Sequence, residues 1–197
     1  MVENIDETSI KIMKATLVVL QREGSKASTK KIAAESGFNE VTIFRKFINK
    51  SNLINATKEY YLKLLMYKLE DVFDYAEDEK IEEFLRITFF GILVLDESDF
   101  DILRLAMEEV RESPNNKSIM LEVALFIIEK LEEFFIKQIE KGVVKDMDIR
   151  SLAVMCYNSI FQSVILWKIY SIDVGFDTNR YVDNLLNMLL EGILVQK

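Results

Sequence analysis

Apolar side chains recur every three or four positions along almost the whole chain, which is the spacing of an amphipathic α-helix. In the first such stretch Ile10, Met13, Leu17 and Leu20 fall on one face, and the stretch ends at Gly24. Similar breaks divide the rest of the chain into about nine predicted helices. They cover residues 6–23, 29–36, 40–47, 51–75, 79–95, 99–112, 117–141, 147–171 and 178–195. We therefore expect an all-α fold.

The second and third predicted helices are joined by a short turn. Ser28 can cap the start of helix 29–36, and Gly37 can end that helix in the left-handed conformation without a Cβ clash. Asn39 can then cap the start of helix 40–47. This arrangement of two short helices around a tight turn predicts a helix-turn-helix.

The third helix has an inner edge and a polar outer surface. Ile43 and Phe47 are expected to face the first helix. The outward side chains are Glu40, Val41, Thr42, Phe44, Arg45 and Lys46. In helix-turn-helix proteins this helix enters the major groove of DNA. We expect a three-helix DNA-binding domain over residues 1–50 and a larger helical domain over residues 51–197.

Charge and composition restrict the chemistry. The net charge is −8, yet residues 1–55 hold nine basic against six acidic side chains, so the basic excess coincides with the predicted DNA-binding domain. Histidine is absent and Cys156 is the single cysteine, which excludes the usual zinc sites and His-assisted nucleophiles. No carboxylate pair stands out as catalytic. We expect neither an enzyme nor a bound metal or cofactor, and Cys156 is expected to be a buried packing residue.

The N-terminal residues are charged from the third position and lack the apolar core of a signal peptide. The longest uninterrupted apolar runs, such as residues 125–128, are far shorter than the ~20 residues that span a bilayer. These observations predict a cytoplasmic protein with no membrane partner.

Residues 28–54, STKKIAAESGFNEVTIFRKFINKSNLI, resemble the DNA-binding signature of TetR-type (tetracycline-repressor-like) transcriptional regulators. The resemblance includes the step from Phe44 to Phe47 and the Asn49-Lys50 pair that opens the fourth helix. It implies a DNA-binding domain joined by the fourth helix to a ligand-binding core, and a homodimer formed through the last two helices of each subunit. Its double-stranded DNA operator would be palindromic.

Carried over by position, the resemblance assigns DNA contacts to eight residues. Those expected to approach phosphates or bases are Ser28, Thr29, Lys30, Thr42, Phe44, Arg45, Lys46 and Lys50. Phe44 departs from the family pattern, in which a tyrosine often binds phosphate, and can offer only packing or a thymine-methyl contact. Glu40 has two open interpretations: a favourable acid at a helix N-terminus, or an acceptor for cytosine N4.

The larger domain is rich in aromatic residues, which predict a hydrophobic core and an apolar cavity within it. The candidate effector-binding residues are Phe89, Leu93, Phe126, Tyr157 and Phe161. The effector would be a small apolar or amphipathic molecule, and helix 51–75 would transmit its binding to the DNA-binding domain. The expected function is a ligand-responsive repressor. The alternative is an architectural DNA-binding protein without a small-molecule ligand.

Overall fold

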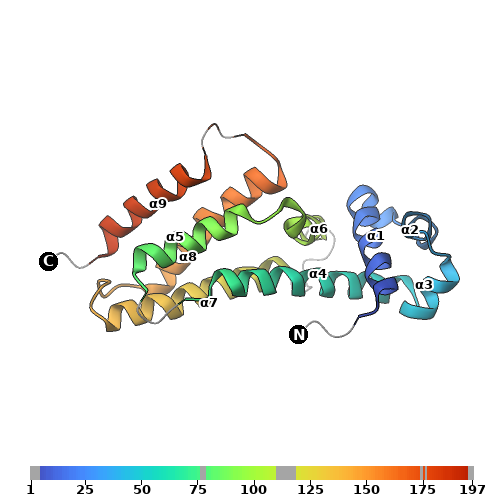
Figure 1. Ribbon diagram of the computed structural model, residues 1–197, viewed down its shortest axis with the longest axis horizontal. Coiled ribbons are helices and arrows are strands. Elements are labelled where there is room, and N and C mark those ends of the chain that lie inside the picture. Colours follow the sequence, from blue (N-terminus) through green and yellow to red (C-terminus); the bar gives the residue numbers. More distant parts are fainter. Residues whose placement is uncertain (1–4, 76–78, 110–118, 174, 176, 195–197) are drawn as a thin grey trace. The chain divides into compact units, whose positions relative to one another are not determined.

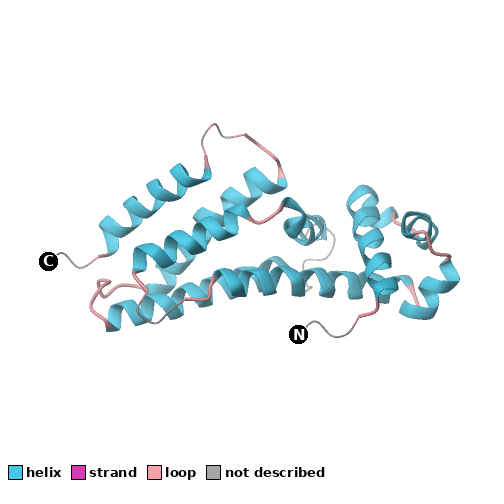
Figure 2. Ribbon diagram, viewed as in Figure 1, coloured by secondary structure: helices cyan, strands magenta, loops and turns pink. Residues whose placement is uncertain are grey.

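The computed structural model describes residues 5–75, 79–109, 119–173, 175 and 177–194. Within these residues the chain is helical apart from its connections, with one isolated β-bridge between Val144 and Leu194 (Figures 1 and 2). The predicted all-α class is confirmed. The α-helices are α1 (Glu7–Glu23), α2 (Thr29–Ser36), α3 (Glu40–Phe47), α4 (Lys50–Val72), α5 (Ile81–Val94), α6 (Asp101–Glu109), α7 (Ile119–Glu140), α8 (Ile149–Val164) and α9 (Thr178–Ile193).

Three predicted helix boundaries in the N-terminal region are confirmed. The Ser28 side chain accepts a hydrogen bond from the Lys31 N–H at 3.3 Å, and the Asn39 side chain accepts one from the Thr42 N–H at 2.8 Å. Gly37 has φ 73°, in the left-handed region where a Cβ would be strained. These local contacts explain why the sequence places the turn between α2 and α3 correctly.

Two other helix ends differ from the prediction. Helix α4 ends at Val72 rather than near Tyr75, because the N–H groups of Phe73 and Asp74 form a tight turn back to the carbonyls of Glu70 and Asp71. Helix α8 ends at Val164 and continues as a π-helical turn, Ile165–Ile169, with a Tyr170 N–H to Ile165 O bond of 2.9 Å. Apolar periodicity does not distinguish a π turn from an α turn.

The chain divides into two compact units. The first comprises Met1–Met66 and Ser98–Ile119, and the second comprises Tyr67–Glu97 and Met120–Lys197. Helix α4 therefore starts in the first unit and ends in the second. The predicted domain boundary at residue 50 stays a prediction.

In the first unit α1 packs against α2 and α6, and α2 packs against α3. Ile12, Ile32, Ile43 and Leu53 are each fully buried in it. Burial of side chains of this size stabilises the fold by about 1.5–3 kcal/mol each relative to exposure. This apolar centre fixes the angle at which α3 leaves the turn.

In the second unit α5 packs against α8 and α9. Phe84 stacks on Phe134 of α7, with ring centroids 3.7 Å apart. Gly91 allows α5 to approach α4 closely, because a Cβ at that position would meet Val72 Cγ1 at 3.1 Å. Tyr181 of α9 also binds α8, since its hydroxyl donates to Ser159 O at 3.1 Å.

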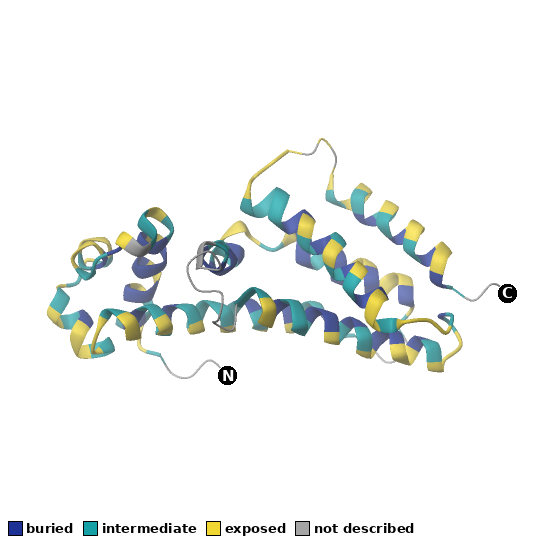
Figure 3. Ribbon diagram, turned by 180° about the vertical axis from the view of Figure 1, so that it is seen from behind, coloured by how far each residue is buried: buried dark blue, intermediate teal, exposed yellow. Residues whose placement is uncertain are grey.

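Apolar surface on α8 and α9 is not fully covered within the chain (Figure 3). Met155 on α8 is 57% exposed and Met188 on α9 is 77% exposed. Among the described residues, one helical segment, Ile149–Ile169, is long and apolar enough to cross a membrane by length and composition, and 33% of its apolar window is buried. The core helix of a soluble protein passes the same test, so this segment by itself assigns no membrane role.

Candidate DNA-binding surface and effector region

The helix-turn-helix places α3 as an exposed helix on a buried support. Within α3, Ile43 is fully buried. Thr42, next to it, and Lys46, one turn further along, are partly exposed. Phe44 and Arg45 are exposed on the outer side. The burial pattern confirms the inner position of Ile43, whereas Phe47, which was also predicted to face inward, is only partly buried. An exposed helix of this kind, with cations in its last turn, has the form of a DNA-reading helix.

The start of α2 offers the polar groups predicted for phosphate contact. Ser28 and Thr29 are partly exposed, and Lys30 is exposed. The Thr29 hydroxyl, however, donates a 2.6 Å hydrogen bond to the Glu40 carboxylate of α3. This bond ties the beginning of α2 to the beginning of α3. It also gives Glu40 an intramolecular partner, which the sequence did not indicate.

Lys46 also has an intramolecular partner. Its ammonium group lies 2.8 Å from the Asp6 carboxylate, which caps α1 by accepting from the Ser9 N–H. The bond from Lys46, followed by that from Ser9, holds the pKa of Asp6 well below its usual range. Because the Asp6 side chain is exposed to solvent, the pair is screened and contributes little to stability. A DNA phosphate would have to compete with Asp6 for Lys46.

A single strained residue shapes the connection from α3 to α4. Ile48 has φ 68° and ψ −51°, and the Asn49 N–H donates to Phe47 O at 2.7 Å. These values describe a γ-turn of the rare kind, which is unfavourable for a β-branched residue. Asn49 then caps α4 by accepting from the Asn52 N–H at 2.8 Å. Lys50 is thereby placed in the first turn of α4, where backbone N–H groups favour a phosphate.

Comparison with known proteins agrees with this geometry. The family model described as bacterial regulatory proteins, tetR family, matches residues 12–57. This range begins within α1, includes all of α2 and α3, and ends in the first part of α4. Residues 12–57 therefore form a DNA-binding domain of the TetR type. The recognition made from residues 28–54 is confirmed, and the helix-turn-helix is a DNA-binding domain of a transcription regulator. No curated protein is significantly similar to the chain in sequence.

Solved structures extend the TetR-type fold to nearly the whole chain. A Clostridium perfringens protein described as a fatty acid metabolism regulator has a TM-score of 0.68 at 19% identity, covering 94% of this chain and 100% of its own. The fatty acid degradation regulator FadR from Bacillus halodurans has a TM-score of 0.69 at 21% identity, covering 95% and 97%. A tetR-family regulatory protein from Rhodococcus RHA1 has a TM-score of 0.71 at 14% identity, covering 98% and 100%. At these identities the likeness shows the fold alone.

The five predicted effector residues occupy different environments in this TetR-type fold. Phe89 and Leu93 of α5 are each 1% exposed, whereas Phe126 of α7 is partly exposed. Tyr157 and Phe161 of α8 are partly exposed and stack with ring centroids 5.0 Å apart. Burial raises the pKa of Tyr157 to about 12. Its hydroxyl is neutral near pH 7, as that of any tyrosine is, and can donate a hydrogen bond.

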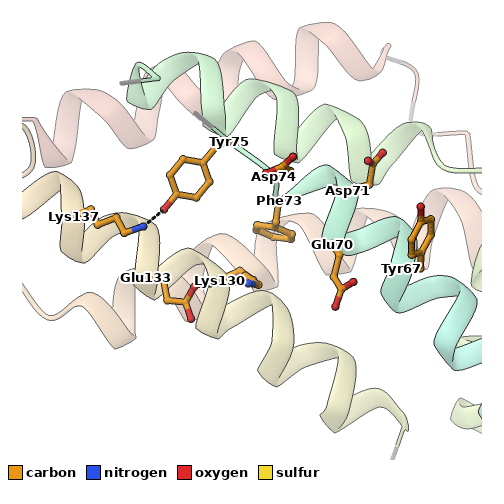
Figure 4. Close-up of a pocket in the computed structure, with 9 residues that line it drawn as sticks. All are labelled: Tyr67, Glu70, Asp71, Phe73, Asp74, Tyr75, Lys130, Glu133 and Lys137. Atoms are coloured by element: carbon orange, nitrogen blue, oxygen red, sulfur yellow. Dashed lines mark hydrogen bonds and ion pairs between the residues drawn. The ribbon is translucent and has the colours of Figure 1, made fainter. Parts of the chain in front are cut away.

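A groove of about 670 Å³ lies elsewhere, between the end of α4 and the middle of α7 (Figure 4). Its lining is mostly charged and aromatic: Tyr67, Glu70, Asp71, Phe73, Asp74, Tyr75, Lys130, Glu133 and Lys137. Lys137 donates to the Tyr75 hydroxyl at 2.9 Å across it. None of the five predicted effector residues lines this groove. Its charged walls do not match the apolar site that the sequence predicts.

Cys156 is confirmed as a buried residue, and its chemistry gives a direct test of the packing of α8. Burial raises the pKa of its thiol from 9.0 to about 12. The reactive thiolate at pH 8 is therefore about a thousandfold scarcer than for a free cysteine. We expect Ellman's reagent to label the native protein at least roughly a hundredfold more slowly than the denatured protein. The native rate should also keep rising with pH beyond pH 9, where that of an exposed thiol would level off.

Since the sequence holds one cysteine, the labelling signal has a single source. Rapid labelling of the folded protein at pH 8 would contradict the packing described for α8.

Proposed function

We propose that this chain is a TetR-type transcriptional repressor that binds a palindromic operator as a homodimer. A small apolar or amphipathic effector would release it from DNA. The observation that carries the proposal is the exposed α3, with Arg45 on its outer side, inside a domain that matches the family. The site of action would be the cytoplasm, where bacterial DNA is located.

The uncovered apolar surface of α8 and α9 supports assembly as a dimer. Met155 on α8 and Leu185, Met188 and Leu189 on α9 are partly or largely exposed in the single chain. Apolar side chains at this density favour burial against a second copy, and a two-fold interface uses the same surface on both subunits. A dimer also presents two reading helices, which a palindromic operator requires.

The apolar character of the second unit supports the class of effector. Two structural neighbours are described as regulators of fatty acid metabolism or degradation. We propose that a fatty acyl chain or a similar amphipathic molecule enters the helical core beside Phe126, Tyr157 and Phe161. The neutral Tyr157 hydroxyl would bind its polar end. Side-chain movement at Phe89 and Leu93 would make room for its apolar part.

Helix α4 is proposed to carry the signal, because it is continuous from Lys50 to Val72 and contributes to both units. An effector shifts the equilibrium only if it binds the DNA-free arrangement more tightly than the DNA-bound one. A tilt of α4 that alters the separation of the two reading helices would provide this difference. A coupling of about 1–3 kcal/mol, roughly 5- to 150-fold in operator affinity, is typical.

The test is competition on operator-bound protein. Saturated fatty acids and acyl thioesters of increasing chain length are titrated against the complex, with short charged metabolites as a comparison set. We expect release by the long-chain compounds only. Phe161→Ala should raise the concentration needed by about tenfold or more, and Tyr157→Phe by about two- to tenfold for loss of one hydrogen bond.

The matched control is Tyr170→Phe, which removes a hydroxyl from an exposed position after the π turn and should leave the titration unchanged. Release by charged metabolites alone, or identical titrations in all variants, would overturn the apolar-effector proposal. Uniform binding along any duplex, with no selected site, would favour the architectural alternative.

A further inference from the structure

Two large apolar side chains lie exposed side by side on the DNA-reading helix. Val41 is 76% exposed and Phe44 is 41% exposed, and their i, i+3 spacing makes them neighbours on one face of α3. Ile43 between them is fully buried, so the two exposed residues are not part of the core. A pair of apolar groups kept in solvent on a reading helix indicates a surface that is covered when DNA binds.

The polar groups near this pair restrict what can cover it. Glu40, in the same first turn as Val41, is held by the Thr29 hydroxyl at 2.6 Å. Its carboxylate therefore has a structural role, which favours the first of its two sequence interpretations over cytosine recognition. Arg45, next to Phe44, is exposed and basic. The occupant must therefore be apolar locally and carry negative charge nearby.

The major groove of DNA meets both requirements at one base. Thymine is the base whose major-groove edge carries an apolar group, the C5-methyl, and phosphates flank it on both strands. We infer that Val41, together with Phe44, is a specificity-determining contact to thymine methyl groups in each operator half-site. This inference rests on the proposed function, since it requires α3 to enter the major groove. It assigns to Val41 a base contact in addition to the predicted reading residues Thr42 and Arg45.

Uracil-substituted DNA isolates this contact, because deoxyuridine differs from thymidine only by the methyl group. An operator is first obtained by selection of random duplex DNA on the full-length protein. Each thymine of the half-site is then replaced by deoxyuridine in both halves. At the contacted position we expect affinity to fall about fourfold per half-site and about fifteenfold in total, from about 0.8 kcal/mol per buried methyl.

Val41→Ala should show the complementary behaviour. It should weaken binding to the thymine operator by a similar factor, and it should no longer distinguish thymine from deoxyuridine at that position. The matched control is Val18→Ala on α1, an exposed valine outside the reading helix, which should keep the full discrimination. Both positions are exposed, so the folded state should tolerate either change.

The outcomes separate this inference from the proposed function. Selection that enriches no sequence overturns the proposed function and the inference together. An operator that is bound specifically, but whose half-site contains no thymine or whose thymines can all be replaced at unchanged affinity, overturns the inference alone. So does a Val41→Ala protein that discriminates between thymine and deoxyuridine as strongly as wild type.

Discussion

Replacing Arg45 with alanine is expected to lower operator affinity by roughly tenfold to a hundredfold while leaving the protein folded. Arg45 is exposed on α3, so its removal leaves no cavity in the domain. A good arginine contact to a guanine edge is worth about 1–3 kcal/mol of discrimination. The weakening should therefore concentrate at particular base pairs, and a Thr42→Ala change should relax a different position. Binding to a set of single-base operator variants measures both effects.

Lys50→Ala provides the contrasting result for the same surface. A lysine at the start of α4 is expected to neutralise a phosphate, so its removal should weaken specific and non-specific binding together. The slope of log affinity against log salt should fall by about one unit for each phosphate that the protein no longer neutralises. Lys141→Ala, a change of the same charge on an exposed residue of the second unit, is the control. If the Thr42/Arg45 double alanine variant keeps both affinity and selectivity, α3 is not the reading helix.

Met188→Lys is expected to convert the proposed dimer to a monomer at micromolar concentration and to lower operator affinity by about a hundredfold or more. Met188 is 77% exposed in the single chain, so the substitution is tolerated by the isolated fold. In a two-fold interface the lysine would appear twice, which buries two like charges without partners. Dissociation of the dimer also removes the second half-site from the complex, and with it the gain from simultaneous binding.

Sedimentation velocity of wild type and variant gives the oligomeric state, and operator titration gives the affinity. Ile136→Lys on α7 is the control, because it places the same charge on another exposed apolar position of the second unit. It should leave the dimer intact. A wild-type protein that is already monomeric at micromolar concentration, or a Met188→Lys protein that remains dimeric, would show that α8 and α9 do not form the interface.

Short-range patterns along the chain were enough to predict the helices and the position of the DNA-binding helix. Caps and turns act within a few residues, so Ser28, Gly37 and Asn39 could be assigned their roles from their neighbours alone. Apolar periodicity likewise predicted most of the described helix ends to within a few residues, with the end of α8 as an exception, and the buried Ile43 followed from it. The predicted helix ends at residues 112, 117 and 195 lie outside the described residues. Both patterns depend on residues close together in the sequence, so they can be interpreted without the tertiary structure.

Long-range packing, in contrast, sets which polar groups already have partners and which apolar groups stay exposed. The Thr29–Glu40 and Lys46–Asp6 pairs join residues 11 and 40 positions apart, and no short-range pattern specifies them. The same is true of the aromatic residues, since Phe84 is buried against Phe134 from another helix whereas Phe44 is left exposed. Burial depends on which helix faces pack together, and that packing is a property of the whole chain rather than of any segment within it.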